Sequence, residues 1–538
     1  MPSVRMNARP LNPRNRIVTF YRDAALTLLL FVGVACIEGG DAIKAPTTTF
    51  DVNEDSEIVS EFEVPDTMSC SSCVVDLAES WKRLQELGEV SDTPNGLERT
   101  FLSPASQRAM NMIAEWMRDA GMHTWFDEVG NVHGRVKGTS GKEEKALLIG
   151  SHLDTVRDAG KYDGALGIVV GIAAVKALNL EAVSTGIPLE KPVHVVAFSD
   201  EEGVRFSSTF LGSRAVVGTL SEESFTSLDA DGKTFLEALN EAGFKGTRDA
   251  LETARILDRI NAYVEVHIEQ GPVLQESHLP AAPVDSISGQ TRLSVCIFGV
   301  QGHAGTVPMS RRKDAVAAAA EMIHHIEGLC QKSHPSEDTL LVCTVGEVRV
   351  WPGASNVISS NTNFSVDIRS KSNTERNLVV QDVIRYINET CERREIVCHV
   401  DRNHDASAVK CDPHITSGIK RAIINAQAEI EADESLKNLS LKDVGENLGT
   451  RYLVSGAGHD ALAIADAIPV GMMFVRCRDG ISHSPLESID PEDVTFAERA
   501  LFNLLKIHQK EAASLVGVDD RNASGSLISP QSGLIKGD

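Results

Sequence analysis

Short apolar runs alternate with amphipathic stretches through most of the chain, and this pattern predicts its secondary structure. Runs of strand length indicate a short strand at 124–127 and buried strands over 146–149, 193–198, 263–271 and 470–475. Apolar residues at helical spacing run from about Cys73 through Met117, and a second helical stretch follows Asp163. Strands and helices that alternate in this way predict an α/β fold built in layers.

The pattern changes near Thr291, where apolar and polar residues begin to alternate one by one. Strands are predicted over 292–300, around 341–350, over 362–369 and over 397–400, with helices from about 314 to 326 and near 379–392. Elements in this order predict a small inserted α+β domain. Short apolar runs that alternate with amphipathic stretches resume near Ala406.

Histidines and carboxylates stand where the predicted buried strands end, which is where open α/β sheets place their active sites. Taken singly, each has an ordinary structural explanation, as a helix cap, a solvated acidic loop or a core histidine. Together they provide three imidazoles and two carboxylates, from His152, Asp163, Glu202, His267 and His483. This set suits two divalent ions such as Zn²⁺ or Mn²⁺ with one bridging carboxylate. Because no thiolate takes part, a catalytic pair is expected rather than a structural zinc site.

The balance of charge narrows the class of partner. The chain carries 52 Lys and Arg against 76 Asp and Glu, a formal net charge of −24, and it has no dense cluster of basic residues. A surface that binds nucleic acid or anionic lipid needs such a cluster. The sequence therefore favours a small-molecule substrate, with no nucleic acid as partner.

The two ends of the chain are predicted to lie outside the fold. Five arginines up to Arg22 precede an apolar run from Ala24 to Cys36, which predicts a secretory signal peptide over 1–42. The expected location is therefore the endoplasmic reticulum or secretory pathway. An uncleaved anchor is the alternative, and only then is a membrane expected. Residues 43–75 are predicted to be an acidic linker and 517–538 a disordered tail.

The ten cysteines do not indicate a disulfide framework. Cys70 and Cys73 have the spacing of a redox motif without its strand and helix, so a local disulfide or no role is expected. The others lie in apolar segments, where buried free thiols are expected. Sequons that would permit glycosylation in a secretory compartment occur at Asn363, Asn388, Asn438 and Asn522.

Six motifs, taken in order along the chain, resemble the amidase and carbamoylase branch of the M20 metallopeptidase family. They are Gly-Ser-His-Leu-Asp-Thr from Gly150, Gly-Lys-Tyr-Asp-Gly from Gly160, Asp-Glu-Glu-Gly from Asp200, Val-Glu-Val-His-Ile-Glu-Gln-Gly from Val264, Gly-His-Ala-Gly-Thr-Val-Pro-Met from Gly302 and Gly-Ile-Ser-His-Ser-Pro from Gly480. The resemblance covers roughly residues 80 to 512. It implies a di-metal catalytic domain in two parts, 76–290 and 406–516, around an inserted α+β lid and dimerisation domain over 291–405.

The resemblance assigns the metal ligands individually. His152 and His267 would hold one ion, Glu202 and His483 the other, and Asp163 would bridge the two. Mn²⁺ is the ion expected first and Zn²⁺ the alternative, since histidine and carboxylate ligands accept both.

The resemblance also implies catalytic and substrate-binding roles. Glu201 would accept a proton from the attacking water, and Asp154 would orient His152. His303 would reach from the lid into the facing subunit of a homodimer and stabilise the developing oxyanion. The amides and carboxylate of the substrate would be bound by Gln290, Asn356 and Arg369.

The reaction implied is hydrolysis of a ureido group of allantoate, which yields ureidoglycine, ammonia and carbon dioxide in purine and ureide catabolism. The glycine-rich turn from Ser455 to Asp460 favours allantoate over ureidoglycolate, whereas N-carbamoyl-L-amino acid hydrolases share this turn. A metabolite-binding relative without activity is the alternative of another class. It would lack a ligand or the base, and this chain lacks none of them.

Overall fold

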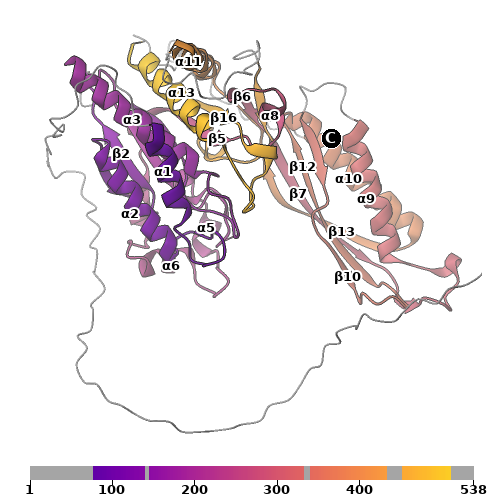
Figure 1. The fold of residues 1–538 in the computed structure, drawn as a ribbon. Helices are drawn as coiled ribbons and strands as arrows, with labels where there is room; N and C mark the ends of the chain where they lie inside the picture. Colours follow the sequence, from indigo (N-terminus) through magenta and orange to yellow (C-terminus); the bar gives the residue numbers. More distant parts are fainter. Residues whose placement is uncertain (1–76, 140–143, 207, 333–339, 433–450, 511–538) are drawn as a thin grey trace, which may run out of the picture. The chain divides into compact units, whose positions relative to one another are not determined.

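The computed structural model describes residues 77–139, 144–206, 208–332, 340–432 and 451–510. The predicted signal peptide, linker and tail lie outside the described residues, as do the Cys70 and Cys73 pair and the sequons at Asn438 and Asn522. Two sheets with their helices make up the described part (Figure 1).

The first sheet has nine strands in the order β1-β2-β4-β3-β5-β16-β6-β14, with β15 paired to β6. The middle strands β4, β3, β5 and β16 run parallel to one another, so their carboxyl ends meet at the same edge. The bounds are β1 (His123–Phe126), β2 (Val132–Val136), β3 (Ala146–His152), β4 (Val193–Phe198), β5 (Ile260–Ile268), β6 (Ala281–Ile287), β14 (Val409–Lys410), β15 (Leu453–Ser455) and β16 (Val470–Val475).

Helices cover both faces of the first sheet, which explains why its strands read as continuous apolar runs. In β3, Leu147 and Ile149 pack into one hydrophobic cluster and Leu148 into another. The first cluster includes side chains of α1 (Leu77–Gly88), α2 (Pro104–Asp119), α3 (Ala165–Thr185), α11 (Pro413–Ala432) and α13 (Pro491–Lys510). Shorter helices complete this part: α4 (Leu211–Val217), α5 (Glu222–Thr226), α6 (Phe235–Glu241), α7 (Arg248–Leu251), α8 (Val273–Glu276) and α12 (Asp460–Ile464).

Helix α3 is apolar on every side because it is enclosed. It is long and apolar enough to cross a membrane by length and composition, and 67% of its most apolar window is buried inside the protein. It contacts β3, β4 and β5 on one side and α1 and α13 on the other. A helix that is hydrophobic all round and packed in this way is a core helix.

Glu498 of α13 is a buried carboxyl group whose protonation makes stability depend on pH. Its Oε2 accepts a hydrogen bond from Ser80 of α1 at 2.7 Å, and burial raises its pKa from 4.5 to about 7. Between these values the folded chain binds more protons than the unfolded chain, so the free energy of unfolding falls as pH rises. Glu498→Gln keeps an acceptor without the charge. At pH 8 it is expected to be more stable than wild type by on the order of 2 kcal/mol.

Urea unfolding of both proteins at pH 5 and pH 8 checks this expectation. The two proteins should be nearly equal at pH 5, where the wild-type carboxyl is mostly protonated in the folded state. A stability difference that is the same at both pH values would contradict it.

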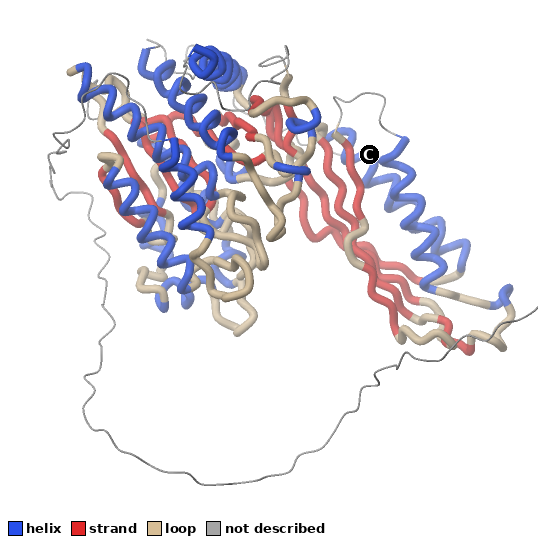
Figure 2. The backbone as a smooth tube through the Cα atoms, viewed as in Figure 1, coloured by secondary structure: helices blue, strands red, loops and turns tan. Residues whose placement is uncertain are grey.

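The second sheet has five strands in the order β10-β12-β7-β13, with β9 paired to β12, and all its pairings are antiparallel. Two helices, α9 and α10, lie along one face of it (Figure 2). We refer to this sheet and its two helices as the lid. The bounds are β7 (Gly289–Phe298), α9 (Ala315–Lys332), β9 (Leu341–Thr344), β10 (Val348–Trp351), β12 (Asn361–Ser370), α10 (Asn373–Arg394) and β13 (Val397–Ala406), and a separate short ladder pairs β8 (Gly302–His303) with β11 (Val357–Ile358).

Side chains of β12 alternate between the two faces of the lid sheet. Phe364, Val366 and Ile368 pack against α9 and α10, whereas Asp367 and Arg369 are half-buried on the other face. The chain passes from the first sheet to the second at Ser288 and returns between β13 and β14. The lid is therefore an excursion between β6 and the last part of the first sheet.

Two predicted elements are each divided in the structure. The helical pattern from Cys73 through Met117 contains α1 and α2, because Ser103 caps a new helix at its amino end and Pro104 begins it. The strand expected around 341–350 is two strands, β9 and β10, which pair with different parts of β12.

The expectation of free thiols is wrong for four cysteines. Cys330 is bonded to Cys343 and Cys391 to Cys398, and both disulfides lie in the lid. Each joins a helix to the strand that follows it, so the pairing arises when helix packs on sheet. Cys296, Cys411 and Cys477 are free thiols, as expected.

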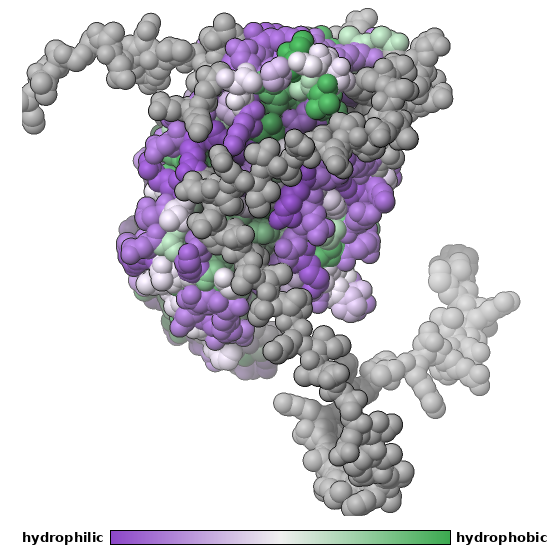
Figure 3. Space-filling model, turned by 90° about the vertical axis from the view of Figure 1, so that its left-hand side faces the viewer, coloured by the Kyte–Doolittle hydropathy of each residue, from purple (hydrophilic) through white to green (hydrophobic). Residues whose placement is uncertain are grey.

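The surface in Figure 3 is mostly hydrophilic, with small apolar areas near its top. A hydrophilic face is expected here, because the buried apolar side chains of the described residues form three hydrophobic clusters inside the protein.

Candidate metal centre

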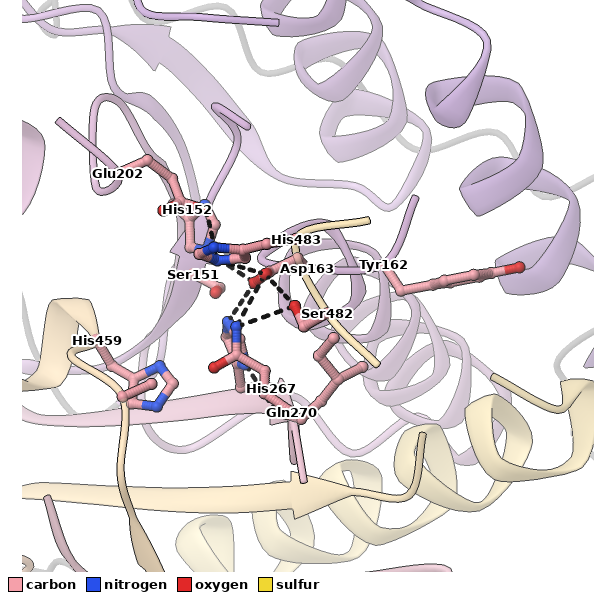
Figure 4. Close-up of polar contacts among 12 residues, drawn as sticks. Ser151, His152, Tyr162, Asp163, Glu202, His267, Gln270, His459, Ser482 and His483 are labelled. Atoms are coloured by element: carbon pink, nitrogen blue, oxygen red, sulfur yellow. Dashed lines mark hydrogen bonds and ion pairs between the residues drawn. The ribbon is translucent and has the colours of Figure 1, made fainter. Parts of the chain in front are cut away.

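The parallel strands of the first sheet bring the predicted ligands to one edge. His152 is the last residue of β3, His267 is the last but one of β5, and Glu202 and His483 follow β4 and β16. Asp163 lies on the turn before α3 and stands between these side chains (Figure 4). The order β4-β3-β5-β16 is what makes four separate segments neighbours.

Asp163 is the centre of this cluster. Its Oδ1 lies 3.0 Å from His267 Nε2 and 3.4 Å from His152 Nε2, and its Oδ2 lies 3.2 Å from His483 Nε2. His483 Nε2 is also 3.3 Å from Glu202 Oε1. Among the described residues, three groups have metal-ligand spacing, and two of them contain Asp163: one with His152 and His267, the other with Glu202 and His483.

The hydrogen bonds of the two buried imidazoles suit a metal. His152 Nδ1 lies 3.0 Å from the carbonyl of Asp154, and His267 Nδ1 lies 2.8 Å from the carbonyl of Ile268. With Nδ1 donating to a carbonyl, each Nε2 is left with a lone pair directed at Asp163. Asp163 Oδ1 is buried and has no aligned hydrogen-bond donor. Imidazole nitrogens and carboxylate oxygens of this kind fit divalent Zn²⁺ or Mn²⁺.

The charges of the cluster are strongly coupled. Burial alone would raise the pKa of Asp163, but the imidazoles of His152, His267 and His483 outweigh it and hold that pKa well below its ordinary value. Burial alone would lower the pKa of His152, but Asp163 and the neighbouring carboxylates hold it well above its ordinary value. The site thus favours positive charge beside a buried carboxylate.

Gly164 permits the close approach of Asp163 to His152. Its φ is +69°, and a Cβ at this position would lie 2.4 Å from the carbonyl oxygen and 2.5 Å from the ring of His152. Only glycine adopts this conformation here without a clash.

Three residues that the sequence did not single out hold Asp163 in place. Gln270 Nε2 and Ser482 Oγ donate to Asp163 Oδ2 at 2.9 and 2.7 Å. Glu487 Oε1 accepts the backbone N–H groups of Tyr162 and Asp163 at 2.8 and 3.1 Å. Gln270 and Ser482 stand beside predicted ligands in their motifs, which was an available signal. Glu487 is 324 residues from Asp163, and no local pattern relates them.

Asp154 holds the backbone of the loop after β4. Its Oδ1 accepts the N–H of Glu201 at 2.9 Å and its Oδ2 that of Glu202 at 3.1 Å. The same carboxylate is 3.8 Å from His152 Nδ1, whose nearer partner is the backbone carbonyl of Asp154. The carboxylate of Asp154 therefore holds the backbone of both glutamates, and its orienting of His152 stays a prediction.

Glu201 is buried beside the metal-type cluster. One of its carboxylate oxygens and ligand atoms of His152 and Glu202 all lie within 4.8 Å of one another. Burial raises its pKa well above the ordinary value, with further contributions from Glu202, Asp460 and Asp154. A carboxylate that readily takes up a proton at such a place suits a general base.

Comparison with known proteins identifies the family. Residues 148–507 match the profile of peptidase family M20/M25/M40. The chain belongs to this family. It is 46% identical over 445 residues to allantoate deiminase 2 of Glycine max, covering 80% of this chain and 89% of that protein.

Two further relatives place the chain within the M20 family. It is 35% identical over 427 residues to an N-carbamoyl-L-amino-acid amidohydrolase of Pseudomonas sp. (strain NS671), covering 79% of this chain and 96% of that protein. The crystal structure of an amidase of the hydantoinase/carbamoylase family from Burkholderia multivorans superposes with a TM-score of 0.68 at 27% identity, covering 80% of this chain and 97% of that one. The chain is therefore an M20 hydrolase whose relatives act on C–N bonds.

The residues predicted to bind substrate in the manner of M20 amidases fall into two groups. Gln290 of β7 is buried and directly opposite Arg369 of β12, and Arg369 lines a cavity of about 460 Å³. His303 and Asn356 are exposed near the β8 and β11 ladder, where Asn356 accepts the N–H of Ala304 through its carbonyl. Within the described residues, neither exposed side chain has a hydrogen bond or ion pair to the cluster around Asp163.

Proposed function

We propose that this M20 enzyme hydrolyses a ureido group of allantoate. The observation that carries the proposal is the cluster of three imidazoles around the buried carboxylate of Asp163, with Glu201 beside it. Allantoate deiminases of plants are its relatives at 45–46% identity, whereas the N-carbamoyl-amino-acid hydrolase of Pseudomonas is 35% identical. The sequence similarity thus favours allantoate over a carbamoyl amino acid.

The proposed reaction uses Glu201 as the group that moves protons. Divalent ions, when bound, would make water more acidic and polarise the ureido carbonyl. Glu201 accepts a proton from the attacking water, and the water oxygen forms a bond to the ureido carbon. Glu201 then returns the proton to the terminal nitrogen, whose bond to that carbon breaks and releases ammonia. The remaining carbamate loses carbon dioxide and leaves ureidoglycine.

Purified protein reconstituted with metal and supplied with allantoate, ureidoglycolate and N-carbamoyl amino acids tests the proposal through ammonia release. Allantoate is expected to give the highest kcat/KM. Preference for an N-carbamoyl amino acid would overturn the choice of substrate, and no release from any of them would overturn the proposed activity.

We further propose that the cluster holds two divalent ions and that Mn²⁺ is the native metal, with Zn²⁺ the alternative. The donor set suits either metal, since it has imidazole and carboxylate groups and no thiolate. Activity after removal of metal and addition of each ion separately tests the choice. Higher activity with Zn²⁺ would overturn it.

We propose that two chains associate through the lid, with His303 of each reaching into the site of the other. No strand among the described residues pairs with the outer edges of β10 and β13. Exposed apolar side chains lie nearby, including Phe298, Val348, Trp351 and Val397. Sedimentation velocity checks the proposal, which a monomer at micromolar concentration would contradict.

We also propose that the chain resides in the endoplasmic reticulum or secretory pathway. The two disulfides of the lid support this location, because disulfides persist in oxidising compartments. Thiol labelling of protein from its native cells, followed by mass analysis, should leave Cys330, Cys343, Cys391 and Cys398 unlabelled. Full labelling of all four would contradict it.

A further inference from the structure

Beside Arg369, on the open face of the lid sheet, lie one acidic side chain, Asp367, and one basic side chain, Arg292. Asp367 is two residues before Arg369 in β12, and Arg292 of β7 is directly opposite Asp367. Alternate residues of a strand point to one face, so these side chains share the face that α9 and α10 leave uncovered. Together with Gly456 they line the cavity of about 460 Å³.

Asp367 holds the guanidinium of Arg369 along one edge. Arg369 Nε donates to Asp367 Oδ1 and Arg369 Nη2 donates to Asp367 Oδ2, both at 3.0 Å. Arg369 Nη1 donates to the carbonyl of Gly456 at 2.8 Å. A guanidinium has five N–H groups, so one on each Nη remains. The edge between Nη1 and Nη2 is the outer fork of this guanidinium, an edge that can bind a carboxylate bidentately.

Arg292 compensates the charge of Asp367 and orients a second polar group. Its Nε lies 3.3 Å from Asp367 Oδ2, and its Nη2 donates to Gln290 Oε1 at 3.3 Å. Two guanidinium groups and one carboxylate leave a net charge of +1 for an anion. Because the oxygen of Gln290 accepts from Arg292, its NH₂ end is the end available for a substrate oxygen.

We infer that Asp367 and Arg292 are positioning residues for substrate binding: they fix Arg369 and Gln290 so that the outer fork of Arg369 binds the substrate carboxylate. The inference rests on the proposed function, in which the substrate carries a carboxylate beside its ureido group. It goes beyond that function in assigning a task to two residues that need not touch the substrate.

The contacts allow two opposite roles for Asp367, and the sign of one measurement separates them. If Asp367 competed with the substrate for Arg369, its removal would strengthen binding of an anion. If Asp367 positions Arg369, its removal leaves a long side chain to be ordered by the substrate. Asp367→Asn is then expected to raise KM for allantoate by about tenfold.

The experiment compares allantoate with its neutral amide, diureidoacetamide, for wild type and D367N reconstituted with metal. For D367N we expect the increase in KM with allantoate, a kcat within about twofold of wild type, and an unchanged KM with the amide. Asp367→Glu keeps the charge, and its KM for allantoate is expected to lie between those of wild type and D367N. Asp401→Asn, an exposed carboxylate on β13, is the matched control and should leave every constant unchanged.

Each other outcome overturns the inference. An unchanged or lower KM for allantoate would show that Asp367 does not position Arg369, and an equal loss with allantoate and amide would show a general structural role. Wild-type protein inactive on allantoate would instead refute the proposed function. In that case the same comparison is made with N-carbamoylglycine and N-carbamoylglycinamide.

Discussion

Asp163→Ala is expected to abolish binding at both metal sites and with it all turnover. One oxygen of Asp163 lies by His152 and His267 and the other by His483, so of the five predicted ligands it alone is shared by the two predicted ion sites. We expect metal affinity at each site to fall by at least about 100-fold. Replacing a residue that only supports a metal ligand already lowers metal affinity by about 10- to 100-fold. Metal content after dialysis, measured by mass spectrometry, checks this.

His152→Ala is the matched control for the Asp163 variant. Of the two groups that contain Asp163, it removes a ligand from one only, so the site of Asp163, Glu202 and His483 should keep its ion. Circular dichroism should show both variants folded, because the cluster lies at the edge of the sheet and not within its hydrophobic clusters. Two firmly bound ions in Asp163→Ala would show that the Asp163 carboxylate does not bridge the two sites.

Glu201→Gln is expected to lower kcat by about 10³-fold while the metal content stays at the wild-type level. Glutamine has the same shape but cannot accept the proton of the attacking water. The backbone of Glu201 remains held by Asp154, so the loop and the neighbouring Glu202 should not move. Ammonia release from allantoate and metal analysis of the same sample provide the two measurements.

Glu202→Gln separates the roles of the two adjacent glutamates. Glu202 lies with Asp163 and His483, so its neutral variant is expected to lose metal, whereas the Glu201 variant keeps it. Near wild-type activity in Glu201→Gln would show that another group takes the proton. Metal loss in both variants would show that Glu201 also acts as a ligand.

Local patterns were sufficient to predict much of the fold. The apolar run from Val193 to Phe198 is β4 with the same bounds, because a strand buried on both faces is apolar at most of its positions. Alternation in the lid predicted β7 and β12 within a few residues, since one face packs on helices and the other does not. The division of the first helical pattern at Ser103 was also readable, since Ser-Pro is a helix start signal.

Other features depended on which segments become neighbours. The two disulfides form where helices of the lid pack on its strands, and spacings of 13 and 7 residues carry no pairing rule. Asp154 was expected to orient His152, yet its carboxylate accepts two amide N–H groups of the loop after β4. The ion pair of Asp367 with Arg369 joins residues two apart, but its importance depends on Arg292 and Gly456 from elsewhere in the chain.

The sequence by itself determined the chemistry that is available here: which residues can bind metal, that they stand at strand ends, and that their donor atoms suit divalent ions. Only the tertiary structure decided that Gln270, Ser482 and Glu487 hold Asp163, and that Glu201 is buried beside the cluster. The physical reason is that residue type and periodicity are local properties of the chain. The distance between Asp163 and a residue such as Glu487 is set by the order of the parallel strands and the packing of helices on them.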